Sequence, residues 1–240
     1  MEKQENLEKQ EGLEKQESKK DIKKKEKYDP NKATLFQKIG RVIVKGAIYG
    51  YCKIVYRIKI IGKENIPQGV PVIFCGNHRT YLDAPLIVST AGRHMRFLSK
   101  EDLKKNPFFA LLGVVFDAIY VKRDEKDLTA VKESLKTLKA GGCIGLFPEG
   151  TRNGLEKNNG EIKNGASYLA IKTGAVIVPI GIIGKAKPFT RNAVIYGKPI
   201  DFSEYKALGK EGEEKATEIL KENIVALAQK DVLTLESPKK

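Results

Sequence analysis

After residue 62, short apolar runs alternate with longer stretches in which apolar residues recur at helical spacing. The short runs predict six strands, at residues 72–75, 95–99, 118–121, 143–147, 176–183 and 192–196. The longer stretches predict helices at residues 84–90, 107–113, 128–139, 165–172 and 212–229. This alternation is typical of a single α/β domain, in which helices cover both faces of a mostly parallel or mixed central sheet.

The segment before this domain is apolar and basic, and its spacing predicts an amphipathic helix at residues 35–56. On a helical wheel Lys38, Arg41 and Lys45 share one face. Apolar residues cover most of the remaining surface: Leu35, Phe36, Ile39, Val42, Ile43 and Ala47. Such a helix can lie at an anionic membrane surface with its cations among the headgroups, or pack on a core with a solvated basic stripe. The lack of any acidic residue in the helix favours the membrane.

The N-terminal residues repeat a polar six-residue unit, as in Glu-Lys-Gln-Glu-Asn-Leu followed by Glu-Lys-Gln-Glu-Gly-Leu. This composition offers too little apolar surface to offset the entropy of ordering the chain, which predicts a disordered or transiently helical tail. We therefore divide the chain into a tail at 1–30, a membrane-associating helical element at 31–60 and the α/β domain at 61–240.

The net charge of +14 lies entirely outside the tail, because residues 1–30 hold nine Lys and nine Asp or Glu. Residues 31–63 carry eight Lys or Arg and no acid. This excess favours an anionic partner such as phospholipid, an acidic carrier protein or nucleic acid. Because the chain has no helix-turn-helix, zinc-finger or aromatic RNA-binding signature, we do not expect nucleic acid.

The three cysteines, Cys52, Cys75 and Cys143, have no spacing typical of a disulfide framework or a zinc site. We expect reduced, buried thiols, and neither a metal ion nor a redox cofactor. The apolar segment near residues 35–61 is interrupted by basic residues and is no clean membrane span. Together with the basic helix, this predicts a peripheral or monotopic protein on the cytoplasmic side of the cell membrane.

His78 follows the predicted strand at 72–75, and Asp83 lies five residues further on, across a turn. The carboxylate can fold back onto the imidazole Nδ1, which leaves Nε2 to take a proton from a substrate hydroxyl. Spacing alone favours a solvated loop histidine, and the position of His78 after a strand and ahead of Pro85 and an apolar helix reduces that preference. The other histidine, His94, has no carboxylate at this spacing and is expected at the surface.

A second motif, Phe-Pro-Glu-Gly-Thr-Arg, ends at Arg152 and follows the predicted strand at 143–147. Gly150 permits a left-handed turn close to a ligand, and the Arg152 guanidinium can hold a phosphate by paired hydrogen bonds. Glu149 could bind a polyol or orient the arginine; a turn with a local ion pair is the alternative. Lys122 and Arg123 place another cationic pair at the end of the strand at 118–121.

The order of these motifs, Asn-His-x₄-Asp, an arginine after a strand, Phe-Pro-Glu-Gly-Thr-Arg and Val-Pro-Ile, resembles the glycerolipid acyltransferases over residues 60–200. The resemblance is greatest to bacterial 1-acyl-sn-glycerol-3-phosphate acyltransferases. It implies catalytic roles for His78 and Asp83, and it implies that the helix at 35–56 belongs to a membrane-binding element. The substrate-binding residues that it implies are Arg123, Glu149, Gly150, Thr151 and Arg152. Thr80 and Asn153 stand where the family often has serine.

The resemblance therefore implies an enzyme that transfers an acyl group from acyl-CoA or acyl carrier protein to the sn-2 hydroxyl of lysophosphatidic acid. The product would be phosphatidic acid, formed without a cofactor. Two alternatives stay open. One is acyl transfer to another acceptor, glycerol-3-phosphate or another lysophospholipid. The other is a non-catalytic module that binds anionic membranes or nucleic acid.

Overall fold

The computed structural model describes residues 33–122, 128–157 and 160–236 of the 240-residue chain. The predicted tail at 1–30 and the predicted site residue Arg123 lie outside the described residues.

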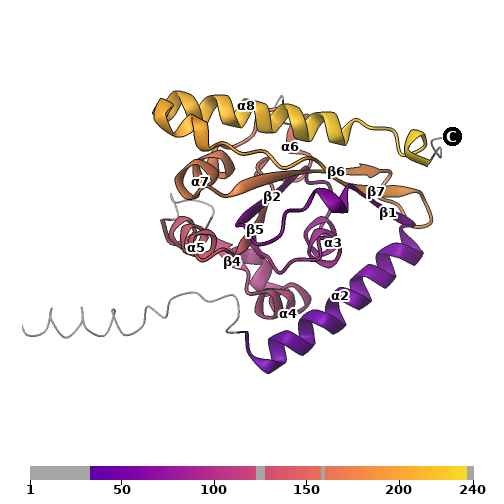
Figure 1. Ribbon diagram of the computed structural model, residues 1–240. Helices are drawn as coiled ribbons and strands as arrows, with labels where there is room; N and C mark the ends of the chain where they lie inside the picture. Colours follow the sequence, from indigo (N-terminus) through magenta and orange to yellow (C-terminus); the bar gives the residue numbers. More distant parts are fainter. Residues whose placement is uncertain (1–32, 123–127, 158–159, 237–240) are drawn as a thin grey trace, which may run out of the picture.

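The described strands form one seven-stranded sheet in the order β1-β7-β6-β2-β5-β3-β4 (Figure 1). Their bounds are β1 (Ile58–Ile61), β2 (Val72–Gly76), β3 (Arg96–Lys100), β4 (Ile119–Val121), β5 (Cys143–Leu146), β6 (Val176–Gly184) and β7 (Asn192–Tyr196). Strands β2 to β6 run parallel, and β7 pairs antiparallel with β6 and parallel with β1. The expected α/β domain with a mixed central sheet is confirmed.

Helices cover the two faces of this sheet (Figure 1). On one face lie α2 (Leu35–Val55), α3 (Asp83–Thr90) and α4 (Pro107–Phe116), and on the other lie α5 (Leu128–Lys139), α7 (Gly165–Thr173) and α8 (Gly209–Ala228). The short helix α6 (Gly154–Lys157) follows the second motif. Short 3₁₀ helices occur at Lys63–Asn65, Glu101–Lys105, Ser203–Leu208 and Thr234–Glu236.

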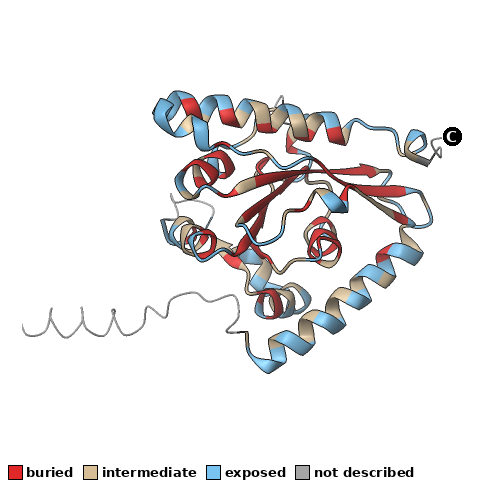
Figure 2. Ribbon diagram, in the orientation of Figure 1, coloured by how far each residue is buried: buried red, intermediate tan, exposed pale blue. Residues whose placement is uncertain are grey.

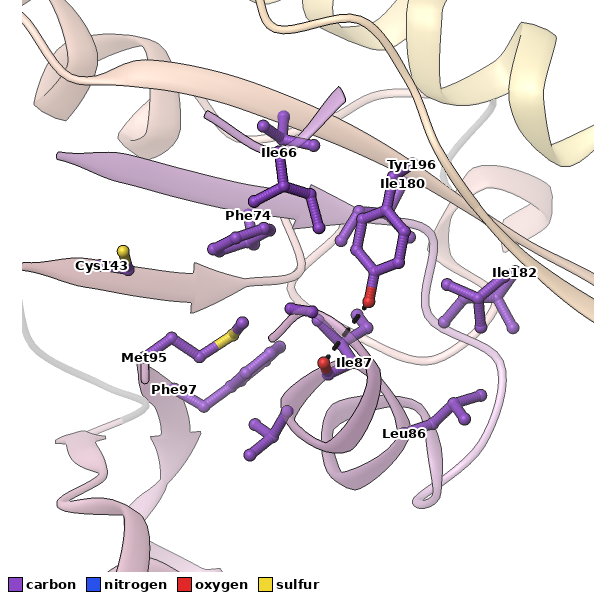
Figure 3. Close-up of a cluster of buried hydrophobic side chains, with 14 of the residues drawn as sticks. Ile66, Phe74, Leu86, Ile87, Met95, Phe97, Cys143, Ile180, Ile182 and Tyr196 are labelled. Atoms are coloured by element: carbon purple, nitrogen blue, oxygen red, sulfur yellow. Dashed lines mark hydrogen bonds between the residues drawn. The ribbon is translucent and has the colours of Figure 1, made fainter. Parts of the chain in front are cut away.

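The central strands are buried on both sides, as expected for a parallel sheet between two helical layers (Figure 2). Along β2 the side chains alternate: Val72 and Phe74 join the core under α3 and α4, and Ile73 and Cys75 join the core under α5, α7 and α8. On the α3 side, Tyr196 of β7 points towards Ile87 of α3, whose carbonyl accepts from the Tyr196 hydroxyl at 3.4 Å (Figure 3). The same hydroxyl shares a 2.7 Å hydrogen bond with Thr90 Oγ1. All three cysteines are free and buried, as the sequence predicts.

Two elements differ from the expectation. Helix α4 continues past Gly113 to Phe116, so Gly113 does not end the helix. It stands there because it packs against the Tyr120 hydroxyl, where a larger residue would not fit. Strand β1 was not predicted, since Lys59 interrupts its short apolar run and the run adjoins the basic helix. The proposed boundary between 60 and 61 falls inside β1, so the sheet already begins at Ile58.

Two of the three basic side chains on one face of α2, Arg41 and Lys45, reach towards the rest of the protein, whereas Lys38 is exposed. Arg41 Nε donates to the Val115 carbonyl at 2.9 Å, and Lys45 Nζ donates to the Arg93 carbonyl at 3.3 Å. Gln37 Nε2 donates to the Val114 carbonyl at 3.0 Å. Val114 and Val115 belong to the last turn of α4, whose carbonyls have no partner within the helix, so α2 supplies the donors that α4 needs.

The opposite face of α2 leaves large apolar side chains exposed along the helix (Figure 2). Val42 is 74% exposed and Ile43 is 64% exposed, and α4 adds exposed apolar side chains beside them. We call this the apolar surface; its members are Leu35, Phe36, Ile39, Val42, Ile43, Phe108, Leu111 and Val114. Among the described helices, none is both long enough and apolar enough to cross a membrane.

Candidate active site

The two motifs meet because they leave neighbouring parallel strands at the same edge of the sheet. Strands β2 and β5 are paired, with Cys75 opposite Leu146, so Asn77-His78 and Phe147-Pro148-Glu149 emerge side by side. Asn77 is buried and exchanges two hydrogen bonds with Ile182 of β6: its Nδ2 donates at 3.0 Å and its Oδ1 accepts at 2.6 Å. This pair fixes the direction in which the chain leaves β2.

His78 and Asp83 are paired as the sequence predicts. The imidazole Nδ1 lies 2.9 Å from Asp83 Oδ2, and the Asp83 side chain is almost fully buried at the first position of α3. Asp83 Oδ2 also accepts the backbone N–H groups of Arg79, at 2.5 Å, and Thr80, at 2.7 Å. The Thr80 hydroxyl donates to Asp83 Oδ1 at 2.8 Å. Only donors surround this carboxylate, so we assign the bridging proton to Nδ1 and the free lone pair to Nε2.

The ring of His78 is held flat against Phe147. The two ring centroids are 4.0 Å apart and the planes differ by 1°. Phe147 in turn packs on Phe97 of β3 at 5.0 Å. With one nitrogen on Asp83 and one face on Phe147, the imidazole has a fixed orientation, and it lines the cavity described below.

Glu149 links the two motif loops through hydrogen bonds to backbone N–H groups. Its Oε1 accepts the His78 backbone N–H at 2.8 Å, and its Oε2 accepts the Leu155 backbone N–H at 3.0 Å. The Asn153 N–H donates to the His78 carbonyl at 2.6 Å, which adds a second link between the loops. The Glu149 side chain is buried, so it supports the site from behind.

Gly150 turns the chain with a φ of +68°, the left-handed conformation that glycine adopts without strain. Beside it runs the side chain of Lys163, which a Cβ atom at position 150 would displace. Two residues on, Arg152 lies over the ring of Tyr81, with its Cζ 3.9 Å from the ring centroid.

A cavity of about 780 Å³ opens beside these groups. His78, Gly150, Thr151 and Arg152 line it, whereas Asp83 and Glu149 lie behind its wall. Three lysines also line it: Lys100 at the end of β3, Lys122 after β4 and Lys163 before α7. Most of the remaining wall is apolar and comes from α3, α4, α5 and α7. A base and cations that line a largely apolar cavity suit a substrate that has a hydroxyl group, an anionic group and a hydrocarbon chain.

The sequence analysis singled out seven of the residues at or behind this cavity wall, and it missed four that the fold adds. Lys100, Lys163, Tyr81 and Phe147 line the cavity without having been singled out. Lys100 could have been found, because it follows a predicted strand as His78 does. The sequence spacing does not indicate Lys163, the contact of Tyr81 with Arg152 or the stacking of Phe147 on His78, because all three depend on contacts between distant segments.

His94 departs from its expected place at the surface. It lies half-buried next to α2, and its Nδ1 atom is buried with no hydrogen-bond partner among the described residues. Burial, reinforced by Arg41, Lys45 and Arg96, lowers its pKa from 6.5 to about 3. The ring is therefore uncharged at neutral pH.

The family model described as Acyltransferase matches residues 57–183, more than half of the chain, and this range contains both motifs. The chain belongs to the acyltransferase family. It is 28% identical to the chloroplastic 1-acyl-sn-glycerol-3-phosphate acyltransferase LPAT1 of Arabidopsis thaliana over 204 residues, which cover 80% of this chain and 56% of the relative. It is 32% identical to the 1-acyl-sn-glycerol-3-phosphate acyltransferase of Borreliella burgdorferi over 143 residues, 58% of this chain and 56% of the relative.

The chain thus spans about half the length of these two curated relatives. A shorter relative, the 1-acyl-sn-glycerol-3-phosphate acyltransferase of Bacillus subtilis, is 26% identical over 180 residues, 72% of this chain and 89% of the relative. The fold of this chain is similar to the crystal structure of PlsC, the 1-acyl-sn-glycerophosphate acyltransferase of Thermotoga maritima. The TM-score is 0.54 at 21% identity, covering 81% of this chain and 99% of that one.

Proposed function

We propose that this acyltransferase moves an acyl group from an acyl thioester to the sn-2 hydroxyl of 1-acyl-sn-glycerol-3-phosphate, giving phosphatidic acid. The observation that carries the proposal is the 2.9 Å pair of His78 and Asp83 at the wall of a cavity that Arg152 also lines. The names of the three relatives above support the same acceptor.

His78 acts as the general base in this proposal. Its Nε2 takes the proton of the sn-2 hydroxyl while the oxygen attacks the thioester carbonyl carbon. When the tetrahedral intermediate collapses, the carbon–sulfur bond breaks and the thiolate takes the proton from the imidazolium. The products are the ester and a free thiol, and His78 returns to its neutral form. Asp83 holds the ring and stabilises its transient positive charge.

Arg152 binds the acceptor's phosphate in this scheme, because a guanidinium can give two parallel hydrogen bonds to phosphate oxygens. Lys100, Lys122 and Lys163 line the same cavity and add positive charge around that phosphate. We also retain Arg123, Gly150 and Thr151 as substrate-binding residues. For Glu149 the geometry favours a positioning role over direct contact, since both of its oxygens already accept backbone donors.

The same proposal includes attachment to a membrane. The apolar surface of α2 and α4 faces away from the protein, and the chain outside residues 1–30 carries the whole charge of +14. We infer that this surface enters the acyl-chain region of an anionic leaflet, on the cytoplasmic side, while Lys38 remains among the headgroups. Within this arrangement we keep the division into a tail at 1–30, a membrane-associating element at 31–60 and the acyltransferase domain at 61–240, although residues 58–60 already belong to the sheet of that domain.

Replacement of the base tests the reaction. The His78→Ala variant is expected to lose about 10²–10⁴-fold in kcat, because the hydroxyl group would lack a positioned proton acceptor. Transfer of radiolabelled acyl groups from acyl-CoA and from acyl carrier protein to lysophosphatidic acid measures this loss and identifies the donor. His94→Gln, which alters the other histidine, serves as the matched control and should keep its turnover. Full activity of His78→Ala would contradict the proposal.

A second candidate keeps the chemistry and changes the acceptor. The lyso-ornithine lipid O-acyltransferase of Rhizobium meliloti is 27% identical over 149 residues, 61% of this chain and 45% of the relative. A panel of lysophosphatidic acid, glycerol-3-phosphate, lysophosphatidylcholine and lyso-ornithine lipid separates the two candidates. The first predicts the highest kcat/KM on lysophosphatidic acid, and the second predicts it on a different acceptor.

A further inference from the structure

We propose that Tyr81 is a positioning residue that holds the Arg152 guanidinium ready for the acceptor's phosphate. This inference rests on the proposed function above and concerns a residue within the loop between His78 and Asp83. In this inference the Tyr81 side chain links the loop that carries the base His78 to the phosphate-binding Arg152.

The geometry places the Tyr81 ring between two segments that are distant in the sequence. One contact is with Arg152, whose Cζ lies 3.9 Å from the ring centroid, well within the range of a cation–π interaction. The other is with Phe109 of α4, at 5.7 Å between ring centroids with the planes inclined at 42°. Tyr81 and Arg152 both line the cavity.

The aromatic ring of Tyr81 contributes little to the hydrophobic core. Its side chain is 51% exposed, and it belongs to neither main hydrophobic cluster of the described residues. The two neighbours in its loop that support the base, Thr80 and Asp83, act through hydrogen bonds that do not involve the Tyr81 ring. The main effect of the ring is therefore to position Arg152 and to form part of the cavity wall.

An exposed arginine without such a support samples many rotamers, and ordering them opposes phosphate binding. Arg152 is exposed in this structure. A ring already in contact with the guanidinium reduces the number of rotamers to be lost, and it leaves the edge of the planar group, where the N–H donors lie, open to an anion. Because the ring sits in the His78–Asp83 loop, the arginine is positioned relative to the base itself.

A double-mutant cycle in acyl transfer tests the inference. We would use the full chain with a short-chain lysophosphatidic acid below its critical micelle concentration, so that membrane attachment does not limit turnover. Tyr81→Leu is expected to raise the KM for this acceptor about 2- to 30-fold, the range of a cation–π contact, with kcat nearly unchanged. Tyr81→Phe keeps the ring and should behave as the unsubstituted chain does.

The decisive arm uses an Arg152→Gln background, in which Tyr81 has no guanidinium to hold. There, Tyr81→Leu should change kcat/KM by less than about twofold if the two residues act as one unit. Equal losses in both backgrounds, or a loss in Tyr81→Phe as large as in Tyr81→Leu, would overturn the inference and leave the proposed function standing. Absence of acyl transfer by the unsubstituted chain to any acceptor of the panel would overturn both.

Discussion

At the scale of single residues, Glu149 is buried and its carboxylate accepts two backbone N–H groups, those of His78 and Leu155. Among the described residues, no other acceptor bonds to these two N–H groups. In Glu149→Gln one oxygen becomes an amide NH₂, which cannot accept, so one buried N–H loses its partner. We expect the free energy of unfolding to fall by about 1–3 kcal/mol. We also expect kcat to fall, because the His78 backbone is no longer held.

Urea unfolding of this variant measures the loss of stability. Glu156→Gln is the matched control, since Glu156 is exposed on α6 and its change should stay within about 0.5 kcal/mol. If Glu149→Gln proved as stable as this control, Glu149 would not be the link between the loops.

His94 gives a prediction about pH. Its pKa is about 3 in the folded protein and near 6.5 when unfolded, so between these values the unfolded chain binds more protons. Stability should therefore decrease as the pH falls from about 6.5 towards 3, with this residue contributing up to about 1.4 kcal/mol per pH unit. Urea unfolding at pH 7, 6 and 5 should show a steeper decline for the unsubstituted chain than for His94→Gln. Parallel declines would show that His94 is solvated in the folded state.

At the scale of secondary-structure elements, α2 carries the prediction for membrane attachment. Ile43→Glu places a charge in the centre of the apolar surface, where Ile43 is 64% exposed to solvent. Binding to vesicles that contain anionic lipid is expected to weaken roughly tenfold or more, because apolar burial is lost and a negative charge is repelled. The protein should keep its melting temperature, since this side chain makes little contact with the core.

Co-sedimentation with such vesicles measures the effect. Leu208→Glu is the control, as it adds the same charge at a side chain that is 47% exposed, at the start of α8 on the other face of the sheet. Equal loss of binding in both variants would point to net charge, and unchanged binding of Ile43→Glu would remove the apolar surface from the contact.

Comparing the predicted with the observed helices and strands shows which features follow from the sequence alone. The strand at Asn192–Tyr196 and the helix at Leu128–Lys139 were predicted to the residue, because alternation and helical spacing are local patterns. The wheel also identified the two faces of α2. It could not identify which face turns inward, since that depends on unpaired carbonyls at the end of α4, about seventy residues away in the sequence.

At the scale of the whole molecule, the sequence indicated that two motifs follow strands, and this was enough to expect them near a sheet edge. It did not indicate that β2 and β5 are neighbours, because the strand order of an α/β sheet follows from packing between distant segments. By contrast, the pairing of His78 with Asp83 could be predicted, because only five residues separate them. The stacking of His78 on Phe147 and of Arg152 on Tyr81 could not.

The pairing of β2 with β5 has a consequence for how this protein tolerates change. Backbone hydrogen bonds between these strands fix the distance from the base to the arginine turn, whatever the length of chain between them. That intervening chain forms β3, α4, β4 and α5, which supply much of the cavity wall. Insertions or exchanged segments there would remodel the space for a hydrocarbon tail while the reacting groups keep their alignment. New selectivity can therefore arise without rebuilding the chemistry.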